Sequence, residues 1–366
     1  MLTIIVVTSL AVAPVFDTVF AVDSVVNLPP QLRLAASPEC TYWNFCTVSS
    51  AGDALIYINP DLGEIQRYDF AHERIDTVAD RGGTGRPHPG EFSEPLPAFA
   101  YKETTVVQSG RGRGQVDVPL AVSCTRSGDL LVSDLGNRRI SALGVDGKLR
   151  TSFLLPPSMN PPNELKQLPN GDYLLIGLKL DSHSAANRGT YGNRFNPDGI
   201  LLDSFLTAPS IVLSHNLWSG VDVVADIDDA GELYAAFNVE GSLYWWSFGR
   251  REAERMTEPP AWFVPPPKLD PPLSSGGKPP REFPQSWPRI IRLVSDGRNR
   301  LVMAGLTNGR IPGVSSPFVL EVYGTDGGVI ASRIPSNCFP IGRDADGNVY
   351  FLSLDGKRLL KTHLRK

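Results

Sequence analysis

The feature that most limits the fold of this chain is a short turn unit that recurs six times. In each unit a glycine among polar residues precedes a run rich in Val, Leu, Ile, Tyr and Phe, as in Arg126–Val132 and Pro169–Leu175. Glycine suits a tight hairpin turn because such turns need positive φ, and the runs have the composition of strands. The marker glycines, spaced 43 to 76 residues apart, are Gly52, Gly128, Gly171, Gly231, Gly297 and Gly347.

Hairpins repeated at this spacing are typical of a β-propeller, in which each repeat forms one four-stranded blade. No long stretch keeps the 3.6-residue apolar period of a helix, and 366 residues are enough for a large core. We therefore predict an all-β, six-bladed β-propeller of four-stranded antiparallel blades. The interval between Gly52 and Gly128 leaves room for a degenerate seventh blade around 96–116.

One blade is marked more clearly than the others. We expect its four strands at Leu120–Cys124, Leu130–Ser133, Arg139–Gly144 and Leu149–Leu154. The segments Gly128–Ile140 and Val145–Lys148 resemble an NHL-type repeat of six-bladed propellers, and the loop at 81–95 resembles the loop that leads into such blades. The resemblance covers roughly residues 47–366, although only this blade matches closely. It implies that Asp134, Asn137 and Arg139 hold the turns of the blade together.

The last blade lacks an outer strand, because the chain stops after two runs that follow Gly347. Propeller rings often close with a strand from the other terminus, which also removes an exposed sheet edge. We expect Val22–Leu28 or Leu32–Ala36 to supply that strand.

The N-terminus has the pattern of an export signal. Leu2–Phe16 is almost wholly apolar but too short to span a bilayer comfortably, and Val19 and Ala21 fit the small-residue positions of a signal-peptidase site. We predict a signal peptide at 1–21 and one propeller domain at 22–366, secreted or periplasmic. No Lys or Arg precedes the apolar run, so a buried strand of the fold is the alternative.

Export affects the expected state of the four cysteines. In an oxidising compartment Cys40 and Cys46 can form a disulfide, whereas the alternative is four buried thiols. Their spacing fits no zinc motif.

Four long insertions interrupt the repeats, at 81–117, 181–194, 264–288 and 306–316. By our strand assignment all four lie on one face, the face of the turns between second and third strands and of the links between blades. Long loops gathered on one side of a rigid scaffold are where binding usually resides, although neutral loop drift would give the same pattern. The segment 259–288 is also rich in proline, and we expect a spacer or lid there, partly ordered by its aromatic residues.

These insertions carry more basic than acidic residues, which predicts a mouth that attracts anions such as acidic sugars or peptide carboxylates. Scattered solvated charge is the alternative. The candidate ligand-binding residues are Arg86, His88, Arg111, Arg113, His183, Arg188, Arg194, His215, Trp218 and Arg310.

Tests for other chemistry give weaker signals. His88, His183 and His215 could meet around a central opening and bind a metal, but no local spacing supports such a site, so we expect none. Asp226–Asp229 lacks the alternating ligands of a calcium loop and is expected to stabilise a turn. In Tyr244–Trp246 one indole should pack between blades while its neighbour faces elsewhere.

The leading hypothesis is a monomeric binding module that holds a small anionic ligand, a glycan or a peptide, with no cofactor and no covalent chemistry. The alternatives are a metal-assisted hydrolase, lactonase or lyase on the same scaffold, and a structural partner in an envelope complex. A formal net charge of −4 argues against a nucleic-acid binder, and no further apolar stretch is long enough to span a membrane.

Overall fold

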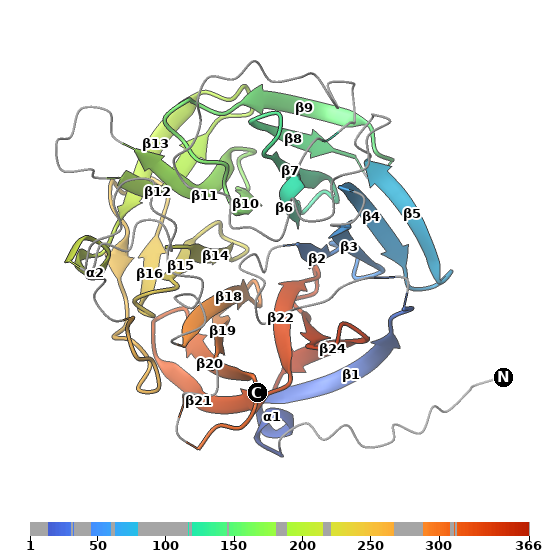
Figure 1. Cartoon of the computed structure of the whole chain (residues 1–366), viewed down its shortest axis with the longest axis vertical. Coiled ribbons are helices and arrows are strands. Elements are labelled where there is room, and N and C mark those ends of the chain that lie inside the picture. Colours follow the sequence, from blue (N-terminus) through green and yellow to red (C-terminus); the bar gives the residue numbers. More distant parts are fainter. Residues whose placement is uncertain are drawn as a thin grey trace.

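The computed structural model contains six four-stranded antiparallel sheets arranged as a ring, which confirms the predicted six-bladed propeller (Figure 1). Each blade is one of these sheets and runs outward from an inner strand beside the central channel. The structure describes residues 14–30, 32, 45–59, 63–79, 116, 119–144, 146–180, 189–214, 221–266, 288–307, 311 and 313–365.

The first three blades follow each other in sequence order. Blade 1 consists of β2 (Cys46–Val48), β3 (Ala54–Asn59), β4 (Glu64–Asp69) and β5 (Arg74–Ala79). Blade 2 consists of β6 (Pro119–Cys124), β7 (Leu130–Asp134), β8 (Arg139–Leu143) and β9 (Leu149–Leu154). Blade 3 consists of β10 (Glu164–Gln167), β11 (Tyr173–Leu180), β12 (Gly189–Phe195) and β13 (Leu201–Thr207).

Blades 4 and 5 repeat this order, and blade 6 takes its outer strand from the N-terminal part of the chain. Blade 4 consists of β14 (Val223–Ile227), β15 (Leu233–Phe237), β16 (Leu243–Trp246) and β17 (Glu254–Arg255). Blade 5 consists of β18 (Arg289–Ser295), β19 (Arg300–Leu306), β20 (Phe318–Gly324) and β21 (Val329–Ser336). Blade 6 consists of β22 (Cys338–Arg343), β23 (Val349–Ser353), β24 (Arg358–Leu364) and β1 (Phe20–Asn27). Two short helices are α1 (Pro14–Val19) and α2 (Ser210–Ser214).

The turn glycines behave as the sequence predicts, because all six marker glycines have φ between +69° and +92°. In blade 2 the four strands lie within one residue of their expected bounds. Asn137 Nδ2 donates to Asp134 Oδ2 at 2.7 Å and Arg139 Nε donates to the same oxygen at 3.2 Å, so these three residues do fasten the β7–β8 turn.

Apolar side chains fill the spaces between neighbouring blades. The interface of blades 3 and 4 shows how: the buried Trp246 stacks on Phe205 with ring centroids 4.0 Å apart. Trp245 points elsewhere and is only partly buried, so the predicted split of the two indoles is confirmed. Trp262 and Phe263, at the start of the proline-rich segment, are buried between blades 4 and 5.

The ring closes by pairing of the first strand with the last, as expected. Figure 1 shows β1 beside β24, and the register runs from Phe20 opposite Leu364 to Asn27 opposite Arg358. The helix α1 also belongs to the fold, since Phe16 and Phe20 are 1% and 0% exposed and both contact the ring of Phe351. The described fold thus uses residues that a cut after Ala21 would remove.

The long insertions fall in four connections: between β5 and β6, β11 and β12, β17 and β18, and β19 and β20. These are the strand 2–3 turns and blade-to-blade links of one face, which we call the loop face. The other face, formed by the turns between strands 1 and 2 and between strands 3 and 4, we call the turn face.

One expectation needs correction, because the insertion expected at 181–194 ends earlier: β12 begins at Gly189, so Arg194 lies in a strand. Strands β2 and β3 of blade 1 contact β6 of blade 2 directly, so the alternative of a seventh blade between them is wrong. Cys40 lies outside the described residues, so a Cys40–Cys46 bridge stays a prediction.

Candidate functional site

A cavity of about 760 Å³ lies at the centre of the ring on the turn face. Its volume is in the range of pockets that hold small ligands. The walls come from the inner strands, which Figure 1 shows around the centre of the ring, and from the turns that follow them. Residues far apart in sequence therefore share one space. The charged residues in the lining are Arg126, Lys166, Asp226, Asp228, Asp229, Arg292, Arg343 and Asp344.

Three inner strands contribute a buried ionic cluster to this cavity. Lys166 Nζ lies 2.8 Å from Asp226 Oδ1 and 3.9 Å from Glu164 Oε2, while Arg292 Nη1 lies 3.3 Å from Glu164 Oε1. The backbone N–H of Ser295 donates to Asp226 Oδ2 at 2.9 Å. Charges taken out of water need such partners, because an unpaired one would cost several kcal/mol.

Burial and pairing set the protonation of the two acids in opposite directions. For Glu164, burial raises the pKa more than the positive charges of Arg292 and Lys166 lower it. For Asp226, burial acts in the same direction, but Lys166 and Arg343 outweigh it and hold the pKa below its usual value. The cluster therefore keeps at least one firm negative charge, on Asp226, beside its two cations.

Arg292 is the most buried cation of the cavity lining, with 4% of its surface exposed. The ladder between β18 and β19 slips between Ile290 and Arg292, and such a bulge re-aims the side chain that follows it. Arg292 Nη2 donates to the backbone oxygen of Ile341 at 2.7 Å, but Nε has no hydrogen-bond partner. A buried donor without a partner is costly, so an acceptor that reached this nitrogen, which is itself shielded from solvent, would relieve that cost.

Two of the cavity acids are occupied by their own turns. Asp228 accepts the backbone N–H groups of Ala230 and Glu232, both at 2.9 Å. Asp344 accepts from the Asn348 backbone at 3.0 Å and lies 3.0 Å from Lys361 Nζ. The predicted turn role of 226–229 thus holds for Asp228. Since these acids are satisfied, the spare hydrogen-bonding capacity of the cavity is mainly on donors.

Asp229 has a different role, because it joins three blades across the mouth of the cavity. Arg126 Nη2 from blade 2 and Arg343 Nη2 from blade 6 both donate to Asp229 Oδ1, at 2.9 and 3.0 Å. Arg126 uses only Nη2 in the contacts described, so other N–H groups of its guanidinium can serve a ligand.

Hydroxyl groups line the wall formed by blades 1 and 2. They belong to Thr47, Ser50, Ser123, Thr125 and Ser127. Thr125 and Ser127 bond each other at 2.9 Å, whereas the buried Ser123 Oγ has no partner. Cys124 lies on the same wall, and burial raises the pKa of its thiol, which disfavours the nucleophilic thiolate.

Of the residues predicted from the sequence to bind a ligand, the one that the structure describes does not line this cavity. Only Arg194 lies among the described residues; it sits in β12, pairs with Asp203 at 2.7 Å and covers the ring of Phe248 at 4.4 Å. Its placement in a loop-face insertion was therefore wrong. The other nine lie outside the described residues: Arg86, His88, Arg111, Arg113, His183, Arg188, His215, Trp218 and Arg310.

Sequence reasoning missed Arg126, Lys166, Arg292 and Arg343. The available signal was their position at or just before the first turn of a blade, where inner strands end. Arg126 is the first residue of the Gly128 unit, and Arg343 lies four residues before Gly347.

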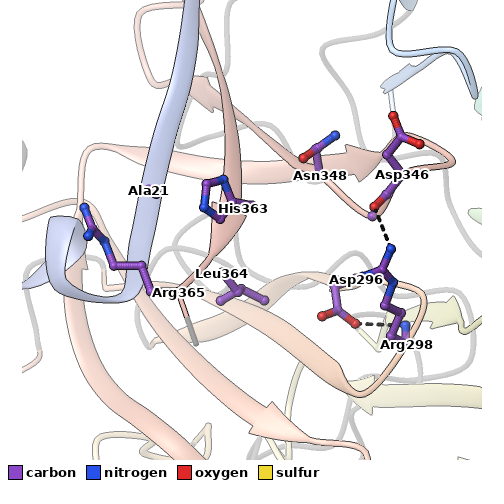
Figure 2. A pocket seen from close by; sticks show the side chains of 9 residues that line it. Ala21, Asp296, Arg298, Asp346, Asn348, His363, Leu364 and Arg365 are labelled. Carbon is purple, nitrogen blue, oxygen red and sulfur yellow. Dashed lines mark hydrogen bonds between the residues drawn. The ribbon is translucent and has the colours of Figure 1, made fainter.

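A second, open groove of about 600 Å³ lies where the ring closes, between blades 5 and 6 (Figure 2). Its carboxylate Asp296 accepts backbone N–H groups of its own turn, and Arg298 reaches the backbone oxygen of Asp346 at 3.5 Å. His363 faces Asp23 at 2.9 Å. These polar groups are thus engaged with each other, and the groove offers less free capacity than the central cavity.

Two further features are absent from the described residues. No group of three or more His, Cys, Asp or Glu side chains in this part of the chain is arranged to hold a metal ion. Among the same residues no helix is long and apolar enough to cross a membrane.

Comparison with known proteins supports the fold. No family model matches the sequence, and no curated protein matches it. Among solved structures, a Bacteroides fragilis protein whose name classes it as exported matches with a TM-score of 0.58 at 9% identity over 96% of each chain. A DUF4221 member from Bacteroides vulgatus matches with a TM-score of 0.55 at 11% identity, over 94% of this chain and 97% of that chain.

An enzyme is also among these structures. A virginiamycin B lyase from Staphylococcus aureus matches with a TM-score of 0.48 at 12% identity, over 94% of this chain and all of that one. At these identities the likeness extends to the propeller fold alone. It leaves open whether this chain binds or converts its ligand.

Proposed function

We propose that this chain is an exported propeller that binds a small hydroxylated anion, of the acidic-sugar class, without covalent chemistry. The site is the central cavity on the turn face. The observation that carries the proposal is Arg292, a guanidinium that is 4% exposed, lines the cavity and has one N–H without a partner.

The chemistry of the other lining residues supports an acceptor-rich ligand. The acids Asp226, Asp228 and Asp344 are already satisfied by lysines, turn amides or both, whereas Ser123 Oγ and the guanidinium of Arg126 keep capacity to donate. A carboxylate would bond the arginines, and hydroxyls would bond the serine and threonine wall.

Export and the repeat type belong to the same proposal. The apolar N-terminus and the likeness to a protein named as exported support export. The Asp134, Asn137 and Arg139 contacts support the NHL-type character of blade 2.

The test is calorimetric titration of the full chain with glucuronate, glucose and acetate. We expect glucuronate to bind most tightly, because it alone combines a carboxylate with several hydroxyls. The paired variant Glu164→Gln/Arg292→Met removes the buried cation without leaving its partner charged, and should weaken glucuronate binding at least tenfold, an order set by loss of a charged hydrogen bond.

Two controls locate the site. Arg298→Met alters the groove of Figure 2 and should leave binding unchanged. Loss of binding in an Arg86→Met/Arg111→Met variant, with the cavity variant unaffected, would place the ligand on the loop face. Turnover of glucuronate lactone that depends on added Ca²⁺ or Zn²⁺ would favour the enzyme alternative.

A further inference from the structure

The carboxylate of Asp229 occupies the position of an anion between two arginines. Arg126 comes from blade 2, Asp229 from blade 4 and Arg343 from blade 6, so three alternate blades meet over the cavity. Both guanidiniums donate to the same oxygen, Oδ1. Two cations that converge on one oxygen form the geometry with which proteins bind a carboxylate.

Asp229 is held by contacts that a ligand can replace. Its side chain is 49% exposed and that of Arg126 is 62% exposed, so the bridge between them is in contact with water. Exposed ion pairs contribute little to stability, and a bound carboxylate would restore the same contacts. Arg343 is different: its side chain is 16% exposed and also donates to the Ile227 backbone oxygen at 3.4 Å, which keeps it in place.

We propose that the ligand binds through a carboxylate that takes the place of the Asp229 carboxylate between Arg126 and Arg343. This inference rests on the proposed function and adds the ligand's anchoring group and the residue that competes with it. A singly charged carboxylate fits better than a phosphate dianion, because it adds less negative charge beside Asp226, Asp228 and the displaced Asp229. The ligand body would then lie toward the hydroxyl wall at Ser123, whose Oγ has no partner.

The experiment is titration of Asp229→Asn and wild-type protein with glucuronate. If Asp229 competes with the ligand, its neutralisation should tighten binding about tenfold, the order expected for release of one exposed and one partly buried ion pair. Asp203→Asn is the matched control, because it also removes a carboxylate bonded to an arginine, Arg194, but outside the cavity lining. It should leave the affinity unchanged.

A double-mutant cycle separates exchange from simple charge repulsion. Arg126→Met should weaken binding, and the gain from Asp229→Asn should be smaller in the Arg126→Met background, where Asp229 competes with the ligand only for Arg343. If the gain is undiminished there, Asp229 acts only as a distant negative charge and the exchange is wrong. Unchanged or weaker binding by Asp229→Asn would also overturn it, while the cavity could still bind the ligand. Absence of glucuronate binding in every variant would overturn both proposals together.

Discussion

Trp262 donates its indole N–H to the buried carboxylate of Glu321 at 2.7 Å, which ties the start of the proline-rich segment to blade 5. The same oxygen, Oε1, also accepts from Ser332 Oγ at 2.8 Å and from the Arg333 backbone at 2.9 Å. One acceptor thus satisfies three donors from two separate segments. Arg333 has a φ of +54°, so this bond also stabilises a backbone conformation that an arginine rarely adopts.

We expect Glu321→Ala to lower the free energy of unfolding by about 3 kcal/mol, because it leaves buried donors without an acceptor. Trp262→Phe loses only one of the three hydrogen bonds to Glu321. It should therefore lower the free energy of unfolding less than Glu321→Ala does. Urea denaturation measures both. Glu258→Ala, at a side chain that is 84% exposed, is the control and should stay within about 0.5 kcal/mol of wild type.

Asp222 predicts a pH dependence of stability. Burial raises its pKa to about 6, even though Arg289 acts in the opposite direction. The folded state then holds a proton that the unfolded state releases near pH 4, so this group makes the protein less stable as the pH rises from about 4 to 6. We expect a loss of about 2 kcal/mol across that window. In Asp222→Asn the loss should be absent, as shown by denaturation at several pH values; an unchanged profile would contradict the assignment.

The N-terminal aromatic residues give a third prediction. Phe16 and Phe20 pack against each other with ring centroids 4.7 Å apart and against Phe351. Phe16→Ala or Phe20→Ala should each cost about 3–5 kcal/mol, the usual cost of such a core truncation. Asp23→Asn, which removes the exposed Asp23–His363 pair in the same strand, should cost less than about 1 kcal/mol.

The same contacts can be tested on the processed chain. A chain that starts at Val22 should melt well below one that starts at Pro14, because it lacks both rings. Intact-mass measurement of the exported protein would show which of the two is the mature form. Equal melting temperatures would mean that these rings contribute little.

Two turn glycines form a matched pair for a fourth prediction. Gly347 and Gly171 have φ of +84° and +92°, but only Gly347 is crowded: a Cβ there would lie 2.6 Å from the Asp296 backbone oxygen, whereas at Gly171 nothing lies within 4 Å. Gly171→Ala should cost about 1–2 kcal/mol for its left-handed backbone. Gly347→Ala should cost clearly more, because the backbone oxygen cannot move aside. Equal losses of stability in the two variants would show that the turn at Gly347 relaxes enough to accept a Cβ.

The fold was predictable because its signals are local. A glycine with positive φ and the apolar run after it lie within about ten residues, and in blade 2 they place every strand. The site was not predictable in the same way. Arg126 and Arg343 lie 103 and 114 residues from Asp229, and only the closed ring brings them together. The bulge that re-aims Arg292 also has no marker in the sequence, since the β18 segment contains neither glycine nor proline.

The N-terminus shows a second limit. The N-terminal segment that contains Phe16 and Phe20 fits both an export signal with its cleavage site and a core segment, because both require apolar side chains. The residues alone do not separate the two, and the buried rings in blade 6 provide the additional constraint.

The pairing of Phe20 with Leu364 has a consequence for how the cavity comes into existence. The cavity is not formed by any single blade, because it is a space enclosed by six inner strands. The ring stays open until β1 pairs with β24, two strands separated by nearly the whole chain. Such distant contacts form late in folding. A nascent or truncated chain would therefore have folded blades but no binding cavity. Ligand binding should then be detected only in chains whose ring has closed.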